Sequence, residues 1–232
     1  MVSLSIVLPV FNERNSIEDV LKEWSSELKK QKINYEFVIC EDGSTDGTSE
    51  FVRIIQKKYK LVLNQVKYRR GYGGAVIDGI KTANSEYILS IDSDGQCDAK
   101  DVKKFWEKRE KADVIIGWRT ERADTVQRRF FSFLFKTVFK TLFPTKIHDP
   151  SAPFVLYKKK TVFPYLKYFK FLKEGFWWGF IGAAVKKNLT IYELPMNHRL
   201  RLNGETVVYK TNKIPSIAFR NLVGLFKLKL EK

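Results

Sequence analysis

Two aspartates separated by one residue follow a short apolar run in the stretch "YILSIDSDGQCD", residues 87–98. The run at 87–91 predicts a buried strand. Residues i and i+2 of an extended chain project to the same side, so the carboxylates of Asp92 and Asp94 would face one point. Two such charges raise each other's pKa unless a cation lies between them. A hard divalent ion that also binds phosphates could be that cation. The alternative is structural, with Asp94-Gly95 as a turn and Asp92 as a cap.

This strand belongs to an alternation of strand and helix patterns in the first half of the chain. The predicted strands are 4–8, 36–40, 61–68, 87–91 and 113–117, and the predicted helices are 16–30, 48–58, 74–83 and 101–111. The alternation predicts an α/β fold with a mostly parallel central sheet and helices on both faces. Ligands of such sheets bind beyond the carboxyl ends of the strands. Four polar loops are expected there: "PVFNE" (9–13), "EDGSTDGT" (41–48), "RRGYGG" (69–74) and "DSDGQ" (92–96).

The positive charge is confined to the second half of the chain. The 232 residues carry a net charge of +16, but residues 1–125 hold 21 basic and 21 acidic side chains, whereas 126–232 hold 21 and 5. Phenylalanines alternate with Lys and Arg in "RRFFSFLFKTVFKTLF" and "YLKYFKFLKEGFWWGF". A basic, aromatic face suits an anionic membrane surface or nucleic acid. No nucleic-acid motif with defined spacing is present, so we expect a membrane surface and no nucleic acid. The alternative is a solvated lysine-rich face over a phenylalanine core.

The second half predicts a less regular set of elements. Helices are expected near 126–143 and 175–187, a strand at 190–195, and an amphipathic helix after Pro215. We expect residues 1–210 to form one domain, with halves 1–125 and 126–210, and residues 211–232 to form a membrane-associating tail. No segment supplies the roughly 18–20 continuous apolar residues of a spanning helix. Cys40 and Cys97 lack metal-ligand spacing and indicate a reducing setting, so we expect a peripheral protein on the cytoplasmic face of a membrane.

At the polar loops the sequence resembles the family 2 glycosyltransferases, and among them the dolichyl- or polyprenyl-phosphate mannosyl- and glucosyltransferases. The segments "SIVLPVFNE", "ICEDGSTDGT", "RGYGGAVIDGI" and "SIDSDGQ" match the family's motifs in order and spacing, and "GWRTERADTVQRRFFS", "HDPSAPF" and "ELPMNHRLRLNGET" continue the pattern. The resemblance implies the GT-A nucleotide-diphospho-sugar transferase fold and Mg²⁺ or Mn²⁺ as cofactor. It also implies that 1–125 binds the nucleotide sugar and 126–210 the acceptor.

The resemblance also implies roles for individual residues. Donor binding falls to Pro9, Phe11, Asn12, Glu13, Ile39, Glu41, Asp42, Gly71, Asp92, Ser93 and Asp94, and metal binding to Asp92, Asp94 and Gln96. Catalysis falls to Asp92, Asp94, Arg119 and Arg201, and acceptor binding to Arg128, Arg129, Ser132, His198, Arg199 and Lys210. Val207 stands where the family carries a lysine, so one phosphate contact is missing or comes from Lys210. Structural roles remain open for several of these residues, since a histidine such as His198 is often a hydrogen-bonded structural imidazole.

The reaction implied is inverting transfer of a hexose from a GDP-mannose or UDP-glucose type donor to a polyprenyl or dolichyl phosphate. An anionic lipid phosphate needs no general base, whereas a sugar hydroxyl does. The second half is poor in acids and rich in Arg and Lys, which favours the phosphate acceptor. The first alternative is a sugar hydroxyl of a glycan or glycolipid, with Glu174 as base. The second is a catalytically silent membrane-binding scaffold, and a membrane protein is a further candidate partner.

Overall fold

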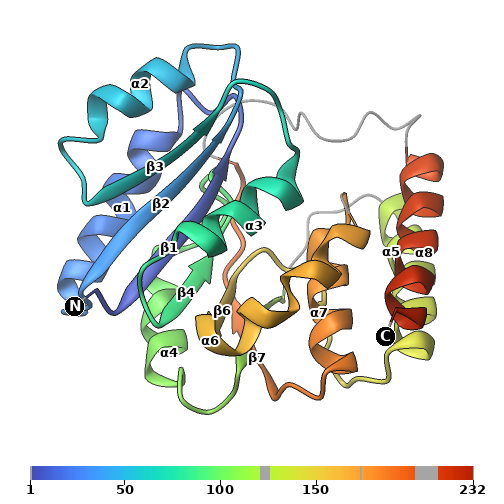
Figure 1. Ribbon diagram of the computed structural model, residues 1–232. Coiled ribbons are helices and arrows are strands. Elements are labelled where there is room, and N and C mark those ends of the chain that lie inside the picture. The colour runs from blue at the N-terminus through green and yellow to red at the C-terminus, as the bar shows by residue number, and fades with distance from the viewer. Residues whose placement is uncertain (1, 121–125, 173, 202–213, 232) are drawn as a thin grey trace.

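The computed structural model describes residues 2–120, 126–172, 174–201 and 214–231, with side chains except those of 126–131, 170, 214 and 215. The strands are β1 Leu4–Val10, β2 Tyr35–Asp42, β3 Leu61–Val66, β4 Tyr87–Ser90, β5 Val114–Arg119, β6 Val155–Lys158 and β7 Ile191–Met196. The α-helices are α1 Ile17–Lys30, α2 Thr48–Ile55, α3 Tyr72–Thr82, α4 Val102–Glu107, α5 Val126–Leu142, α6 Lys159–Val162, α7 Phe176–Lys186 and α8 Ile214–Leu230. Two 3-10 segments, η1 Ala99–Asp101 and η2 Phe163–Phe171, complete the described elements (Figure 1).

The strands form one sheet in the order β3-β2-β1-β4-β6-β5-β7. Within the described chain, β6 is the strand that runs against its neighbours, pairing antiparallel with both β4 and β5. The pairs β1–β2, β1–β4, β2–β3 and β5–β7 are parallel. The mostly parallel sheet expected from the sequence is therefore confirmed, and the carboxyl ends of β1, β2, β3 and β4 meet at one edge.

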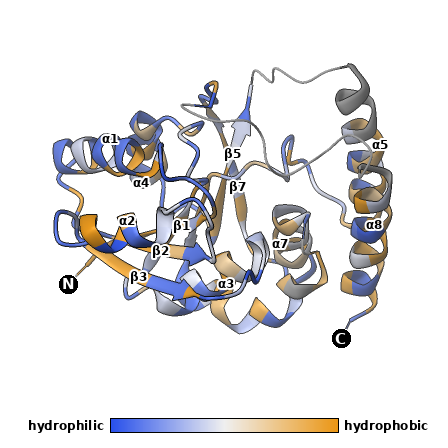
Figure 2. Cartoon of the chain, turned by 90° about the horizontal axis from the view of Figure 1, so that it is seen from above, coloured by the Kyte–Doolittle hydropathy of each residue, from blue (hydrophilic) through white to orange (hydrophobic). Residues whose placement is uncertain are grey.

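Helices cover both faces of the sheet, as the side chains around β6 show. The ring of Phe154 lies 5.8 Å from that of Trp24 on α1 and 4.4 Å from that of Phe105 on α4. Tyr157, three residues further along an extended chain, points to the other face. Its ring lies 5.2 Å from Phe180 of α7. Figure 2 shows α1 and α4 on one side of the sheet and α3 and α7 on the other. The α/β fold class predicted from the sequence is confirmed.

The helix α3 lies close against the sheet because of one glycine. A Cβ at Gly79 would lie 2.4 Å from Cγ1 of Val7 on β1 and 2.9 Å from Sγ of Cys40 on β2. Only a residue without a side chain allows this approach. The contact fixes α3, and with it the loop "RRGYGG" that precedes and begins the helix, over the ends of β1 and β2.

The helices α5 and α8 lie side by side, with α7 between them and the sheet (Figure 1, Figure 2). A Cβ at Gly182 of α7 would lie 3.1 Å from Leu228 of α8 and 3.4 Å from Phe139 of α5, so the three helices meet there. The amphipathic C-terminal helix is confirmed, but it begins before Pro215 and packs on the fold, since Leu225 and Leu228 are fully buried. None of the described helices has the length and apolar composition needed to cross a bilayer.

Two leucines of α8 test whether the helix is part of the folded core. Leu228 is fully buried, whereas Leu230 is 80% exposed. We expect Leu228→Ala to lower the free energy of unfolding by about 2–5 kcal/mol, because it leaves a cavity between α8, α7 and α5. The matched change Leu230→Ala should alter it by no more than about 0.5 kcal/mol. Urea denaturation followed by fluorescence measures both, and equal effects of the two variants would contradict this packing.

Candidate active site

The loops after β1 and β2 are joined by hydrogen bonds that use two predicted donor-binding residues. The backbone N–H of Asn12 donates to Oγ of Ser44 at 2.9 Å, and the N–H of Thr45 donates to Oδ1 of Asn12 at 2.9 Å. The N–H of Glu13 donates to Oγ1 of Thr48 at 3.0 Å. Asn12 adopts a positive φ of 57°, which asparagine tolerates better than most residues. The two loops therefore form one rigid unit.

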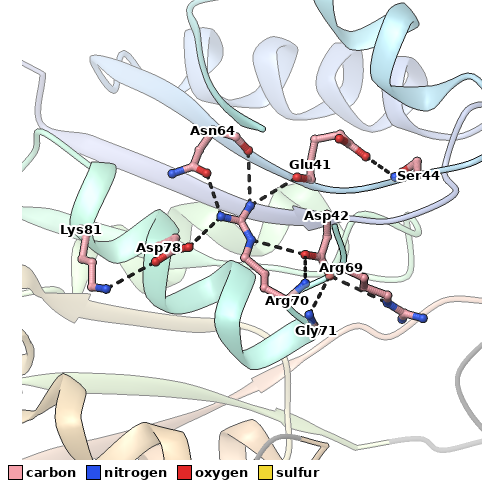
Figure 3. Close-up of polar contacts among 9 residues, drawn as sticks. All are labelled: Glu41, Asp42, Ser44, Asn64, Arg69, Arg70, Gly71, Asp78 and Lys81. Carbon is pink, nitrogen blue, oxygen red and sulfur yellow. Dashed lines mark hydrogen bonds and ion pairs between the residues drawn. The ribbon is translucent and has the colours of Figure 1, made fainter. Parts of the chain in front are cut away.

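Asp42 joins the third loop to this unit. Its Oδ1 accepts the N–H of Arg70 at 2.8 Å and its Oδ2 the N–H of Gly71 at 2.9 Å (Figure 3). The guanidinium of Arg70 donates in turn to Oδ1 of Asn64 and to Oδ2 of Asp78, at 2.8 and 2.7 Å. Both carboxylate oxygens of Asp42 are thus committed to shaping the loop "RRGYGG". The structure brings Asp42 and Gly71 together, as part of the wall of the site.

Glu41 differs from Asp42 in having an uncommitted oxygen. Its Oε1 accepts the N–H of Ser44 at 2.6 Å, but the buried Oε2 has no hydrogen-bond partner among the described residues. Burial raises the pKa of Glu41, yet hydrogen bonding from Ser44, and to a lesser degree from Ser49 and Gly43, outweighs it and the pKa is lowered, so the group is a carboxylate. Nearby, the guanidinium of Arg69 lies 3.8 Å from the centre of the Phe11 ring. Ile39 is fully buried inside the sheet.

The aspartates that follow β4 do not lie in an extended segment: Ser93 and Asp94 are in a turn, and Oδ1 of Asp94 accepts the N–H of Gln96 at 3.0 Å. This is the turn given above as the structural alternative, and it still places the charge of Asp94 near Asp92. Asp92 and Asp94 keep some exposure, whereas Ser93 between them is buried and donates to the carbonyl oxygen of Pro9 at 2.8 Å. Burial and the neighbouring charge of Asp94 raise the pKa of Asp92 to about 7, against the lowering effects of Tyr72, Arg119 and Arg201. The pair is therefore a site of uncompensated negative charge.

Two predicted catalytic arginines lie at the same edge of the sheet, each paired with a carboxylate. Arg119 donates from Nε to Oδ2 of Asp149 at 2.7 Å and from a terminal nitrogen to Oδ1 at 3.0 Å. It also donates to Oγ of Ser151 at 2.8 Å. Arg201 pairs with Glu13, whose pKa is raised because burial outweighs that pairing. The cluster thus draws residues from the ends of β1, β4 and β5 and from the segment after β7.

The metal-binding capacity of this edge rests on the aspartate pair. Among the described residues, no group of three or more His, Cys, Asp or Glu side chains is placed to hold a metal ion. Gln96 donates its backbone N–H to Oδ1 of Asp94 at 3.0 Å and its amide Nε2 to the carbonyl oxygen of Arg199 at 3.1 Å. Two carboxylates fit Mg²⁺ or Mn²⁺, since such ions complete their shell with water and phosphate oxygens.

The predicted acceptor residues are less closely grouped. A terminal nitrogen of Arg199 lies 2.9 Å from both carboxylate oxygens of Glu23 on α1 and also donates to the carbonyl oxygen of Gly95, so this side chain holds the loop after β4. His198 forms an isolated bridge with Cys97. Ser132 is partly exposed on α5. The side chains of Arg128 and Arg129, and all of Lys210, lie outside the described residues.

Two site residues escaped the sequence analysis. The hydroxyl of Tyr72 donates to Oδ1 of Asp92 at 2.7 Å, and Nε1 of Trp177 donates to the Tyr72 hydroxyl at 2.8 Å. The sequence signal for Tyr72 is an aromatic residue among the glycines of the polar loop "RGYGG". Trp177, in "GFWWGF", was grouped with the aromatic residues of the second half. Nothing in the sequence marks its contact with a loop 105 residues away.

The model of the family described as "Glycosyl transferase family 2" matches residues 5–163, more than half of the chain. The chain belongs to glycosyl transferase family 2. This family 2 transferase is also similar to solved structures of glucosyl-3-phosphoglycerate synthase from Mycobacterium tuberculosis, one with Mn²⁺, UDP-glucose and phosphoglyceric acid. That match has a TM-score of 0.75 at 17% identity over 98% of this chain and 79% of the other, and it confirms the GT-A fold.

Curated relatives of this family 2 transferase carry the names of lipid-phosphate glycosyltransferases. A dolichyl-phosphate beta-glucosyltransferase from Dictyostelium discoideum is 29% identical over 97% of this chain and 77% of its own length. One of the same name from Saccharomyces cerevisiae is 30% identical over 84% of this chain and 66% of its length. A dodecaprenyl-phosphate galacturonate synthase from Rhizobium johnstonii is 28% identical over 68% and 48%. This chain thus spans between about half and three quarters of the length of these relatives.

The strain between the aspartates predicts a pH-dependent stability. Asp92 has its pKa raised from 3.8 to about 7, so the folded protein binds this proton more tightly than the unfolded chain and stability falls as the pH rises through that window. Without metal, Asp94→Asn should therefore raise the free energy of unfolding at about pH 8 by on the order of 1 kcal/mol relative to wild type. The gain should vanish near pH 4, where Asp92 is protonated and carries no charge for Asp94 to repel.

Urea denaturation in the presence of a chelator measures this difference. The side-chain oxygen of asparagine can still accept the N–H of Gln96, so the local hydrogen bond is retained. A variant destabilised equally at both pH values would show that Asp94 is a structural cap and does not repel Asp92.

Proposed function

We propose that this chain catalyses inverting transfer of a hexose from a nucleotide-diphosphate sugar to a polyprenyl or dolichyl phosphate. The reaction would use a divalent metal ion and take place at the cytoplasmic face of a membrane. Residues 1–125 would bind the donor and 126–210 the acceptor. The names of the curated relatives support the acceptor class.

The observation that carries the proposal is the negative charge at the end of β4 beside two arginines. Burial and the charge of Asp94 disfavour the ionisation of Asp92, and a cation bound to a diphosphate would relieve that cost. Arg119 and Arg201 lower the pKa of Asp92, which indicates that both charges act at this point. A structural turn alone would not require two arginines, held by Asp149 and Glu13, with their charges beside Asp92.

The nucleoside would bind beside Glu41. The buried Oε2 of this carboxylate lacks a partner, and an N–H of a nucleobase would supply the missing donor. The flat surface of Arg69 on Phe11 would provide a face for the ring. Uracil and guanine both offer such an N–H, so these contacts accept GDP- and UDP-sugars alike.

The chemistry would be a single displacement. An oxygen of the lipid phosphate attacks the anomeric carbon, the bond from that carbon to the nucleoside diphosphate breaks, and the diphosphate leaves with the bonding electrons. A bound divalent ion would supply charge neutralisation for this leaving group. Arg119 and Arg201 would add positive charge fixed in advance by Asp149 and Glu13, which is the arrangement that stabilises developing negative charge.

A phosphate acceptor is favoured over a sugar hydroxyl because it does not need a general base from the second half of the chain. Glu174, the candidate base, is an exposed side chain whose Oε1 lies 2.7 Å from a terminal nitrogen of Arg220 on α8. The Glu174 carboxylate is thus engaged by Arg220, whereas a phosphate acceptor needs no general base. A catalytically silent scaffold would not require this cluster of aspartates and arginines.

The surface of α8 supports binding to a membrane. Phe219, Val223, Phe226 and Leu230 are exposed and recur at helical spacing along one side of α8. Phe133 and Leu134 are exposed on the adjacent α5, and Lys227 and Lys229 are exposed on α8. Exposed apolar side chains beside lysines suit the boundary between acyl chains and anionic headgroups. We call Phe219, Val223, Phe226 and Leu230 the apolar side of α8.

Transfer can be tested directly with a short polyprenyl phosphate and a panel of GDP- and UDP-sugars. We expect a lipid-linked hexose of inverted anomeric configuration, formed with Mg²⁺ or Mn²⁺ and abolished by a chelator. Asp94→Asn should lower turnover by at least about a hundredfold, since a missing charge at the leaving group costs several kcal/mol.

Asp98→Asn provides the matched control, because Asp98 lies in the same loop but accepts the N–H of Lys100, which asparagine can also do. Its turnover should stay near that of wild type. Transfer to a glycan hydroxyl in place of the lipid phosphate would establish the first alternative. Neither product with any donor, in protein that is folded and binds vesicles, would establish the scaffold.

Binding to vesicles tests the membrane surface. Deleting α8 would expose the core beneath Leu225 and Leu228, so we choose surface substitutions. Wild-type protein should bind vesicles that contain acidic lipid and lose affinity as salt is added. Phe226→Ser together with Leu230→Ser should weaken binding by roughly tenfold per side chain, because each apolar group contributes up to about 1.5–3 kcal/mol when buried.

Ile54→Ser is the control for this experiment, because Ile54 is 72% exposed on α2, outside the apolar side of α8. It should leave vesicle binding unchanged. Equal losses with Ile54→Ser, or wild-type protein that ignores acidic vesicles at low salt, would contradict the assignment of this surface.

A further inference from the structure

A partly buried chain of hydrogen bonds joins the second half of the molecule to the aspartate pair. Nε1 of Trp177, on α7, lies 2.8 Å from the hydroxyl of Tyr72, at the start of α3. That hydroxyl lies 2.7 Å from Oδ1 of Asp92, after β4. Trp177 is 5% exposed, and the Tyr72 ring packs edge-on against Phe176, with ring centres 6.2 Å apart.

The chemistry of the three groups fixes the direction of both hydrogen bonds. An indole N–H can donate but cannot accept, so the Tyr72 oxygen must be the acceptor from Trp177. The phenol has one proton of its own, and it is directed at Oδ1 of Asp92. The carboxylate is then held in one orientation, with Oδ1 engaged and Oδ2 left for another partner.

We propose that Tyr72 is a positioning residue that presents Asp92 to a divalent cation through Oδ2 alone, and that Trp177 acts through Tyr72. The proposal rests on the function proposed above, in which Asp92 and Asp94 hold the cation. Removing a group that hydrogen-bonds a metal ligand and fixes its orientation typically lowers metal affinity by about 10–100-fold.

The position of Trp177 ties this orientation to the acceptor half of the protein. α7 packs against η2 and α8, and Phe176 beside Trp177 is 1% exposed. Phe176 and Trp177 are both buried, and their contacts with Tyr72 favour the position in which its hydroxyl reaches Asp92. The orientation of Asp92, which belongs to the donor-binding half, thus depends on α7, a helix of the second half of the chain.

Binding of Mn²⁺, followed by the electron paramagnetic resonance signal of the free ion, tests the proposal without requiring turnover. The variants are Tyr72→Phe, Trp177→Phe and the double variant. Tyr72→Phe keeps the ring and removes the hydroxyl, and should weaken Mn²⁺ binding by roughly 10–100-fold. Trp177→Phe should weaken it less. The double variant should bind no more weakly than Tyr72→Phe, because Trp177 has no effect once the hydroxyl is gone.

Tyr87→Phe is the matched control, since Tyr87 begins β4 and donates its hydroxyl to Glu110, away from the aspartates. It should bind Mn²⁺ as wild type does. In transfer assays, Tyr72→Phe should raise the metal concentration needed for half-maximal rate more than it lowers the rate at saturating metal. Thermal unfolding of each variant identifies any general loss of folding.

The outcomes separate this proposal from the one on which it rests. Wild-type protein that binds Mn²⁺ no better than Asp94→Asn would remove the metal site, and with it the proposed function. Wild-type binding with an unchanged affinity in Tyr72→Phe would overturn the positioning role alone. Strictly additive losses for Tyr72→Phe and Trp177→Phe would show that Trp177 does not act through Tyr72.

Discussion

The structure at the carboxyl edge of the sheet depends on the repulsion between two carboxylates that cannot move apart. Asp92 comes two residues after β4, Asp94 lies in the turn that follows, and Ser93 between them is anchored to the carbonyl oxygen of Pro9. The anchor holds the backbone, so the charges cannot relax away from each other. Burial is the largest cause of the raised pKa of Asp92, the charge of Asp94 is the second, and together they raise it to about 7.

The surrounding loops are stiffened by side chains that bind backbone groups. Asn12, Asp42 and Glu41 each accept a backbone N–H from another loop or from their own. Such contacts fix the site before any ligand arrives, so little ordering is left to be done on binding. The arginines are held in the same manner, Arg119 by Asp149 and Arg201 by Glu13. The charges that would meet a diphosphate are therefore already in place.

Much of this could be predicted from the sequence because the signals are local. Buried parallel strands appear as short apolar runs, and the loops that follow them carry polar residues at spacings that survive without knowledge of the fold. The closeness of Asp92 and Asp94 could be expected from their separation of two residues, although a turn and not strand periodicity produces it. The resemblance of the motifs then identified the fold and the family, which the comparisons confirmed.

What the sequence could not predict depends on pairing between distant segments. The antiparallel β6 lies between β4 and β5, and no local pattern determines which strands become neighbours. The packing of α8 against α5 and α7 depends on Gly182 and Leu228 meeting across 46 residues of chain. The contact of Arg199 with Glu23 of α1 joins residues 176 positions apart, and no local pattern predicts it. The contacts of Tyr72 with Asp92 and Trp177 likewise arise only once three elements are folded together.

The central claim is that a cation and a diphosphate together complete the aspartate pair. The most direct test is calorimetric titration of UDP and GDP into the protein, with saturating Mn²⁺ and with a chelator. Coupling between the two ligands should raise the diphosphate affinity by roughly 5–150-fold when Mn²⁺ is present, and the diphosphate should tighten Mn²⁺ binding by the same factor. If the affinity for both nucleotides were the same with Mn²⁺ and with chelator, the account would be contradicted. It requires a cation between the carboxylates and the diphosphate, which would otherwise repel each other.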